Sequence, residues 1–185
     1  MSKEIQREEA KHLLNKISYI KVLEKSISLS LNLAEHLQNI LKNSSSFSIG
    51  GFSPIQKECL WYVDDFFLSQ TIYVPTIKSE TEMDFVEVSY DDLIEKKLNL
   101  KVDDALVRSI GIPDVLIIPG LLFDKRLNRL GRGAGYYDRY LADFKGLKIG
   151  VCFDEQITDE VQVDENDIKV DLLITNKEIY IRGSK

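Results

Sequence analysis

The sequence has few of the residues that most often perform covalent or metal chemistry. It contains only two cysteines, Cys59 and Cys152, and two histidines, His12 and His36. The cysteines lie far apart without metal-site spacing, so the pattern indicates buried thiols in a reducing cytosol and excludes a disulfide framework. Both histidines fall in the helical N-terminal region, and we expect neither to be catalytic.

Long apolar runs and an excess of positive charge are also absent. No run approaches the roughly 20 residues of a membrane-spanning helix, and the N-terminus carries charges where a signal peptide needs an apolar core. The formal net charge of −6 disfavours binding to bulk nucleic acid or anionic membranes. We therefore expect a cytoplasmic protein with neither nucleic acid nor membrane as a partner, and the length of 185 residues fits one domain.

The first 43 residues are patterned as helices that pack on a later core. Residues 2–16 are rich in helix formers and begin with Ser2, a residue type that caps helices. Apolar residues then recur at three- and four-residue steps, which predicts a second helix with one buried stripe. The stripe comprises Ile20, Leu23, Ile27, Leu31, Ala34, Leu37 and Leu41.

After residue 46 the pattern changes to strands that alternate with helical segments. Strands are predicted at 47–52, 71–74, 83–88, 115–118, 147–153 and 170–174, and the stretch 58–69 is helix-like. Pro75 is expected to stop the second strand, and the apolar run Val115–Ile118 is typical of a strand covered on both faces. The alternation predicts an α/β fold, a single domain over 1–185 in which an open, mostly parallel sheet at 44–182 has helices on both faces.

The segment after Ile118 is the first place to look for a site, because open parallel sheets bind ligands beyond the carboxyl ends of their strands. There the chain reads NRLGRGAGYYDRYL at 128–141. Three glycines at alternate positions let the backbone approach a ligand, and a helix beginning near Gly135 would direct free N–H groups into the loop. With Arg129 and Arg132 adding positive charge, the loop is predicted to bind a polyphosphate.

An isolated Gly-x-Gly is more often a simple turn, but here the two arginines, the buried strand and an acidic residue on the helix favour binding. That acid is Asp138. It is either a partner of the helix dipole or, beside a polyphosphate, a ligand of Mg²⁺, which prefers one or two carboxylates with water and phosphate oxygens. Residues 164–171 offer several second carboxylates, and composition alone does not choose among them.

The segment 119–141 (PGLLFDKRLNRLGRGAGYYDRYL) resembles the signature of 5-formyltetrahydrofolate cyclo-ligases, roughly Pro-Gly-x-x-Phe-Asp, a spacer, then Arg-Leu-Gly-x-Gly-x-Gly-Tyr-Tyr-Asp. Residues 163–171 (VDENDIKVD) are similar to a second block of that family. Further positions that fit in register are Lys3, Arg7, Pro75, Met83 and Phe85. The resemblance implies a three-layer α/β/α sandwich and the ATP- and Mg²⁺-dependent cyclisation of 5-formyltetrahydrofolate to 5,10-methenyltetrahydrofolate, releasing ADP and phosphate.

The resemblance also implies roles for individual residues. The ATP site would comprise Lys3, Arg7, Arg129, Leu130, Gly131, Arg132, Gly133, Ala134, Gly135, Tyr136 and Tyr137. The folate site would comprise Glu58, Met83, Phe85, Arg132, Gly133, Ala134, Gly135 and Tyr136. Asp138 and Asp167 would hold Mg²⁺, and Arg132, Tyr136 and Asp138 would act in catalysis.

Some of these residues have simpler interpretations when each is taken alone. Lys3 and Arg7 fit a solvated helix face, Met83 and Phe85 fit the core, and Glu58 fits an acid in the first turn of a helix. Only the shared register with the family favours the functional interpretation.

Three positions depart from the family pattern. Leu127 stands where most members carry glycine, and Ala134 stands where they carry glycine or lysine. The run 56–59 (QKEC) lacks the acid and the threonine that usually flank the glutamate. Two alternative functions stay open: another enzyme on a similar sheet, such as a sugar-phosphate isomerase or an acyl-CoA-handling protein, and a nucleotide- or folate-binding protein without turnover. The expected oligomeric state is a monomer or a weak homodimer.

Overall fold

The computed structural model describes residues 2–42, 47–55, 57–95 and 107–182. Its centre is a seven-stranded sheet in the order β10-β9-β7-β4-β1-β2-β3, with parallel pairing from β9 to β2 and antiparallel pairing at both edges. The strands of this sheet are β1 (Ser48–Gly50), β2 (Thr71–Ile77), β3 (Met83–Val88), β4 (Val115–Pro119), β7 (Leu147–Cys152), β9 (Leu172–Thr175) and β10 (Ile179–Ile181). The helices are α1 (Lys3–Lys16), α2 (Tyr19–Leu41), α3 (Tyr90–Ile94) and α4 (Tyr136–Asp143), with 3₁₀ helices η1 (Asp65–Ser69) and η3 (Asp154–Gln156).

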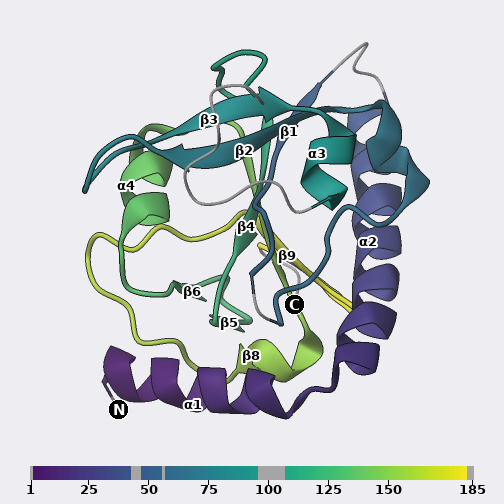
Figure 1. Cartoon of the computed structure of the whole chain (residues 1–185). Helices are drawn as coiled ribbons and strands as arrows, with labels where there is room; N and C mark the ends of the chain where they lie inside the picture. Colours follow the sequence, from purple (N-terminus) through teal and green to yellow (C-terminus); the bar gives the residue numbers. More distant parts are fainter. Residues whose placement is uncertain (1, 43–46, 56, 96–106, 183–185) are drawn as a thin grey trace.

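Helices cover both faces of this sheet, and Figure 1 shows α2 and α4 on opposite sides of it. Along β4, Val115 and Ile117 belong to the core that α2 covers, whereas Leu116 and Ile118 belong to the core that α4 covers. Because successive side chains of a strand point to opposite faces, one fully apolar strand supplies both cores. The predicted α/β fold with a mostly parallel sheet is confirmed.

The predicted buried stripe of α2 is wrong over the first half of the helix. Ile20 is 72% and Leu31 is 52% exposed, and Leu23 and Ile27 are exposed as well, while Ala34 and Leu37 are buried as predicted.

Among the described residues, no helix has both the length and the apolar character needed to cross a membrane.

Serines explain which face of α2 is buried. The Ser26 hydroxyl accepts a hydrogen bond from the Leu60 N–H (3.0 Å). The Ser30 hydroxyl donates to the Trp61 carbonyl (2.9 Å) and accepts from the Asp64 N–H (2.9 Å). These hydroxyls satisfy buried backbone groups of an irregular segment, on the same face of the helix that buries Val22, Leu29 and Leu33.

The helix-like stretch 58–69 is only a 3₁₀ helix at its end, so the prediction of a helix there is wrong. Its apolar residues pack as an aromatic cluster instead: the Trp61 ring meets Tyr62 and Phe67 edge-on at centroid distances of 5.3 and 5.4 Å. The buried Trp61 indole donates to the Phe52 carbonyl (2.8 Å). This cluster, not helical periodicity, is the reason for the density of aromatic residues.

Pro75 does not stop β2, which continues to Ile77. The partner of Pro75 in β3 is Phe85, whose carbonyl accepts from the Gly111 N–H on the far side of β3. Pro75 therefore stands at a position whose nitrogen faces away from β3, and β1 pairs with β2 only up to Tyr73. No ladder hydrogen bond is lost there, which is why the strand tolerates proline.

A smaller sheet of β6 (Arg129–Leu130), β5 (Leu122–Asp124) and β8 (Ile157–Thr158) supports the loop that follows β4. Asp124 is fully buried, and its carboxylate accepts from the backbone N–H groups of Arg126, Asn128 and Val161 and from the Asn128 side-chain amide, at 2.8–3.1 Å. Charge-assisted bonds of this kind fix the turn before the glycine-rich loop. The acid of the Phe-Asp motif is therefore structural.

Leu127, the departure within this turn, adopts the backbone conformation that glycine favours. Its φ is 66°, its N–H donates to the Asp124 carbonyl (2.9 Å), and its carbonyl accepts from the Val170 N–H (3.2 Å). The side chain is buried in the α4-side core. The turn thus keeps a glycine-like backbone, and burial of the leucine side chain offsets the strain.

Leu127→Ala is expected to lower the free energy of unfolding by about 3 kcal/mol, because it removes buried side-chain atoms and keeps the positive φ. Leu127→Gly removes one carbon more but relieves a backbone penalty of about 1–2 kcal/mol. In urea unfolding, the glycine variant should therefore be at least as stable as the alanine variant. Leu173, buried in β9 with a negative φ, is the control: there alanine should be the more stable. The same order at both positions would contradict this account of Leu127.

Candidate active site

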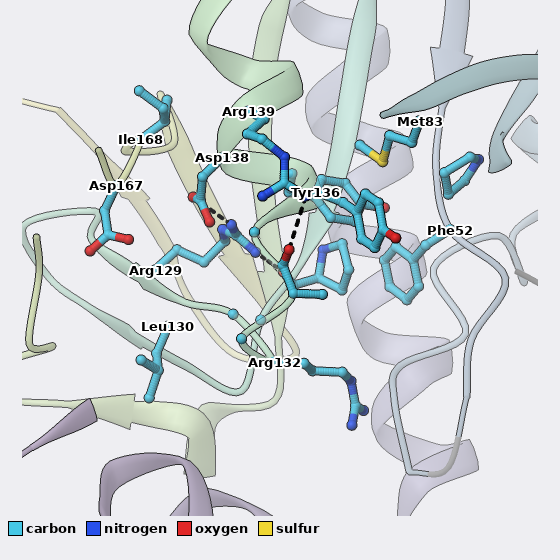
Figure 2. A pocket seen from close by; sticks show the side chains of 18 of the residues that line it. Phe52, Met83, Arg129, Leu130, Arg132, Tyr136, Asp138, Arg139, Asp167 and Ile168 are labelled. Carbon is cyan, nitrogen blue, oxygen red and sulfur yellow. Dashed lines mark hydrogen bonds and ion pairs between the residues drawn. The ribbon is translucent and has the colours of Figure 1, made fainter. Parts of the chain in front are cut away.

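A pocket of about 1190 Å³ lies where the sequence pattern predicts it, beyond the carboxyl end of β4. Its walls come from the start of α1, the segment 52–58, the β2–β3 hairpin, the glycine-rich loop with the start of α4, and residues 164–168. Figure 2 shows Phe52, Met83, Tyr136, Asp138 and Asp167 arranged around one space. The volume exceeds the roughly 300–1,000 Å³ of most small-molecule sites, so the pocket has room for two substrates.

Every residue that the resemblance assigns to a site lines this pocket except Phe85. Met83 faces the pocket, whereas Phe85 is buried two residues further along β3, with its ring centroid 4.9 Å from that of Tyr140. Phe85 therefore supports the wall from behind and is not among the residues that line the pocket. Met83 and Phe85 are two residues apart in a strand, so the alternating sequence pattern places both on one face and does not distinguish them. The structure brings only Met83 to the pocket.

The glycine-rich loop is shaped by positive φ angles at Gly133 (108°) and Gly135 (72°). Gly135 caps α4 without a side chain, so the first N–H groups of the helix have no capping hydroxyl or carboxylate. Arg7 of α1 lies against the loop and donates through Nε to the Gly131 carbonyl (3.1 Å). Free amides, a helix dipole and an arginine make this loop suited to a phosphate.

Arg129 lies below the loop with its side chain only 4% exposed. Its Nη2 donates to the Asp138 carboxylate (2.7 Å) and its Nη1 to the Pro119 carbonyl (3.2 Å). Its Nε is buried and has no hydrogen-bond partner among the described residues. A buried, unsatisfied donor of a cation costs free energy unless a ligand completes it, and in a pocket wall it points to an anion.

Glu58 and Arg132 form an ion pair between two walls of the pocket. Arg132 donates to Glu58 Oε1 from Nε (3.0 Å) and Nη2 (2.8 Å), and the Ile55 N–H donates to Oε2 (3.0 Å). Burial nevertheless raises the pKa of Glu58 above its ordinary value, although Arg132 and the Ile55 amide act to lower it. The reason is that the Arg132 side chain is 37% exposed, so water screens its charge while Glu58 bears the cost of desolvation.

The raised pKa predicts how Glu58→Gln changes stability with pH. Between the ordinary carboxyl pKa and the higher native value, the folded protein holds a proton that the unfolded chain has lost. Stability of the unsubstituted protein therefore falls as pH rises through that window, and the glutamine variant lacks this contribution. The difference in melting temperature, variant minus parent, should grow from pH 4 to pH 7.

Glu35→Gln, at an exposed position of α2, is the matched control and should give a difference that does not vary with pH. A difference for Glu58→Gln that stays constant or shrinks as pH rises would contradict the assignment.

The two carboxylates assigned to Mg²⁺ are each held by a cation. Asp138 pairs with Arg129, and Asp167 accepts from Lys3 Nζ (2.5 Å), which also meets Asp164 (2.7 Å). Burial acts to lower the pKa of Lys3, but the hydrogen bonds of its ammonium group to Asp164 and Asp167 raise that pKa above the ordinary value. The described residues contain no group of three or more His, Cys, Asp or Glu side chains that could hold a metal ion.

Two further polar groups line the site: the hydroxyl of Tyr137, which the resemblance already assigns to the ATP site, and Arg139, which went unnoticed in the sequence. The Tyr137 hydroxyl is buried without a hydrogen-bond partner among the described residues, and burial together with nearby Glu58 raises its pKa above the usual range. Arg139 lines the pocket one helical turn after Gly135. The spacing of four residues from the cap glycine was the available signal for Arg139, since side chains at i+4 lie back over the preceding turn.

Comparisons with known proteins identify the family of the chain. The family model described as the 5-formyltetrahydrofolate cyclo-ligase family matches residues 1–176. A 5-formyltetrahydrofolate cyclo-ligase of Mus musculus is 33% identical over 186 residues, which cover 89% of each chain. One of Mycoplasma genitalium is 34% identical over 119 residues, or 57% of this chain and 70% of the relative.

Two solved structures of similar proteins share the fold over nearly the whole chain. A 5,10-methenyltetrahydrofolate synthetase of Mycoplasma pneumoniae has a TM-score of 0.74 at 25% identity, covering 96% of this chain and 100% of that one. A 5,10-methenyltetrahydrofolate synthetase of Aquifex aeolicus has a TM-score of 0.77 at 22% identity, covering 100% and 95%. The chain belongs to the 5-formyltetrahydrofolate cyclo-ligase family.

Proposed function

We propose that this enzyme converts 5-formyltetrahydrofolate and ATP to 5,10-methenyltetrahydrofolate, ADP and phosphate. The observation that carries the proposal is one pocket that joins an anion-binding half to an apolar half. In the anion-binding half lie the free amides at Gly135 and the unpaired Nε of Arg129. The other half offers Phe52, Pro75 and Met83 as apolar surface. A triphosphate and a flat heterocycle require these two environments side by side.

The chemical difficulty of the reaction is the formyl oxygen, which leaves poorly from an amide-type carbon. In the proposed sequence that oxygen attacks the γ-phosphorus of ATP and ADP departs, so the oxygen becomes part of a phosphate ester. The nitrogen at position 10 then attacks the activated carbon and loses its proton, and the carbon–oxygen bond breaks to release phosphate. Phosphoryl transfer of this kind needs positioning and charge neutralisation more than covalent help from the protein.

The cations around the loop suit that demand. Arg129 offers its unpaired Nε, Arg7 lies against the loop, and Lys3 and Arg132 are each held by carboxylates that a bound phosphate would replace. Developing charge on the transferred group would be met by guanidinium groups already in position. At the apolar end, the Tyr136 ring would offer a flat wall and the Glu58 carboxylate an acceptor for ring N–H groups of the substrate.

The residues also fit Mg²⁺ with a nucleotide. Asp138 and Asp167 come from different elements and line the same pocket, and Figure 2 shows both carboxylates on the same side as Arg129. Two carboxylates completed by phosphate oxygens and water are what Mg²⁺ prefers. When bound with ATP, the ion would neutralise phosphate charge and favour departure of ADP.

A spectrophotometric assay tests the proposal. Purified protein should produce the absorbance of the methenyl product from 5-formyltetrahydrofolate only when ATP and Mg²⁺ are both present, with one ADP formed per product. Binding of both compounds without product would indicate a binding protein, and ADP release independent of 5-formyltetrahydrofolate would indicate a different enzyme. Either outcome would refute the proposed reaction.

A further inference from the structure

Arg139 of α4 joins three parts of the pocket wall through one guanidinium group. Its Nη2 donates to the Ala134 carbonyl in the glycine-rich loop (3.0 Å), and its Nε donates to the Thr81 carbonyl at the tip of the β2–β3 hairpin (2.7 Å). The guanidinium carbon also lies 5.1 Å from the centre of the Tyr136 ring. Figure 2 shows Arg139 and Arg132 on opposite sides of the loop in that view.

The bond to Ala134 determines which way the next amide points. In a planar trans peptide the C=O and the following N–H point in opposite directions. Because Arg139 holds the Ala134 carbonyl, the N–H of Gly135 is directed away from Arg139. The helix itself does not fix this peptide, since the first helical bond of α4 runs from the Arg139 N–H to the Gly135 carbonyl (3.1 Å).

Gly135 is matched to this arrangement. Its φ of 72° favours glycine, and a Cβ there would lie 2.6 Å from Nη1 of Arg139. The guanidinium therefore occupies the space that a side chain at 135 would take. Without Arg139, the Ala134 carbonyl would be free to turn toward the pocket, where an oxygen dipole repels a phosphate.

We infer that Arg139 is a positioning residue for the nucleotide: it holds the Ala134–Gly135 peptide so that the Gly135 N–H faces the phosphates. The inference rests on the proposed function only in requiring that the loop bind a nucleoside triphosphate. The inference does not extend to Tyr136. Its ring is held independently of Arg139 by a hydrogen bond from its own hydroxyl to the Ser79 carbonyl (3.2 Å).

Calorimetric titration with Mg²⁺ and a non-hydrolysable ATP analogue tests the inference without turnover. Arg139→Met should weaken binding of the analogue about tenfold or more, the effect of losing one hydrogen bond to a charged group. Affinity for 5-formyltetrahydrofolate should change less than about threefold, because Tyr136 keeps its tether. Arg139→Lys retains a cationic donor for the Ala134 carbonyl and should recover part of the lost affinity.

Arg126→Met is the matched control, since Arg126 is an exposed arginine that pairs with Glu160 and is not among the residues that line the pocket, and it should bind the analogue as the parent does. Unchanged affinity of Arg139→Met for the analogue would overturn the inference. So would an equal loss for both ligands with a lower melting temperature, which indicates a structural role. If the parent protein binds no nucleotide, the proposed function itself fails, and that result is distinct from both.

Discussion

Asp138→Asn is expected to lower the turnover number by a factor of about 100 or more, because removing one preorganised electrostatic partner typically costs about 3 kcal/mol of transition-state stabilisation. Asp138 lies in the first turn of α4, lines the pocket and neutralises Arg129. Asparagine keeps an acceptor for the Arg129 hydrogen bond, so the fold should survive. The missing charge would weaken the hold on Mg²⁺ and leave the arginine uncompensated when no nucleotide is bound.

The measurement is steady-state turnover at saturating ATP, Mg²⁺ and 5-formyltetrahydrofolate, with circular dichroism to verify folding. Asp143→Asn is the matched control, since Asp143 is an exposed aspartate at the other end of the same helix, and its turnover should match that of the parent. Folded Asp138→Asn protein with undiminished turnover would remove Asp138 from the mechanism. A partial recovery when Mg²⁺ is raised above the concentration that saturates the parent would support the assignment of Asp138 to the metal.

The parts of the fold and site that the sequence predicted are those set by local physics. Strand β3 matched its predicted bounds because alternation leaves one register for a half-buried strand. The loop at 129–135, which lines the pocket, could be singled out because glycine spacing, arginines and a helix start all act within a few residues. The position of this loop beyond β4 followed from the general geometry of parallel sheets.

The parts that sequence reasoning missed depend on partners distant along the chain. The face of α2 was misjudged because Ser26 and Ser30 are satisfied by backbone groups of residues 60–64, and no periodicity reveals that. Glu58 meets Arg132 across 74 positions of sequence, and Arg139 meets Thr81 across 58. The chemistry of such a side chain does not predict its role, because the role depends on partners that only the fold brings within hydrogen-bonding distance.

Arg129→Met is expected to abolish detectable nucleotide binding and to lower the free energy of unfolding by about 3 kcal/mol, the scale for breaking one side of a buried ion pair. Methionine has similar length and no charge, so it fills the space but leaves Asp138, whose side chain is 22% exposed, without its cation. The loss should therefore come from an uncompensated carboxylate and not from a cavity. Urea unfolding measures the stability, and titration with Mg²⁺ and an ATP analogue measures the binding.

The double variant Arg129→Met/Asp138→Asn distinguishes these causes, because it removes the stranded charge together with its partner. We expect it to recover about half of the stability that Arg129→Met loses, a coupling of about 1–2 kcal/mol in the cycle. Nucleotide binding should not return, since the donor at Nε and both charges of the Arg129–Asp138 pair are gone. Simple addition of the two losses would show that the residues act independently. Recovery of stability without recovery of binding would instead show that the stability loss comes from the stranded carboxylate, whereas the binding loss comes from the missing guanidinium.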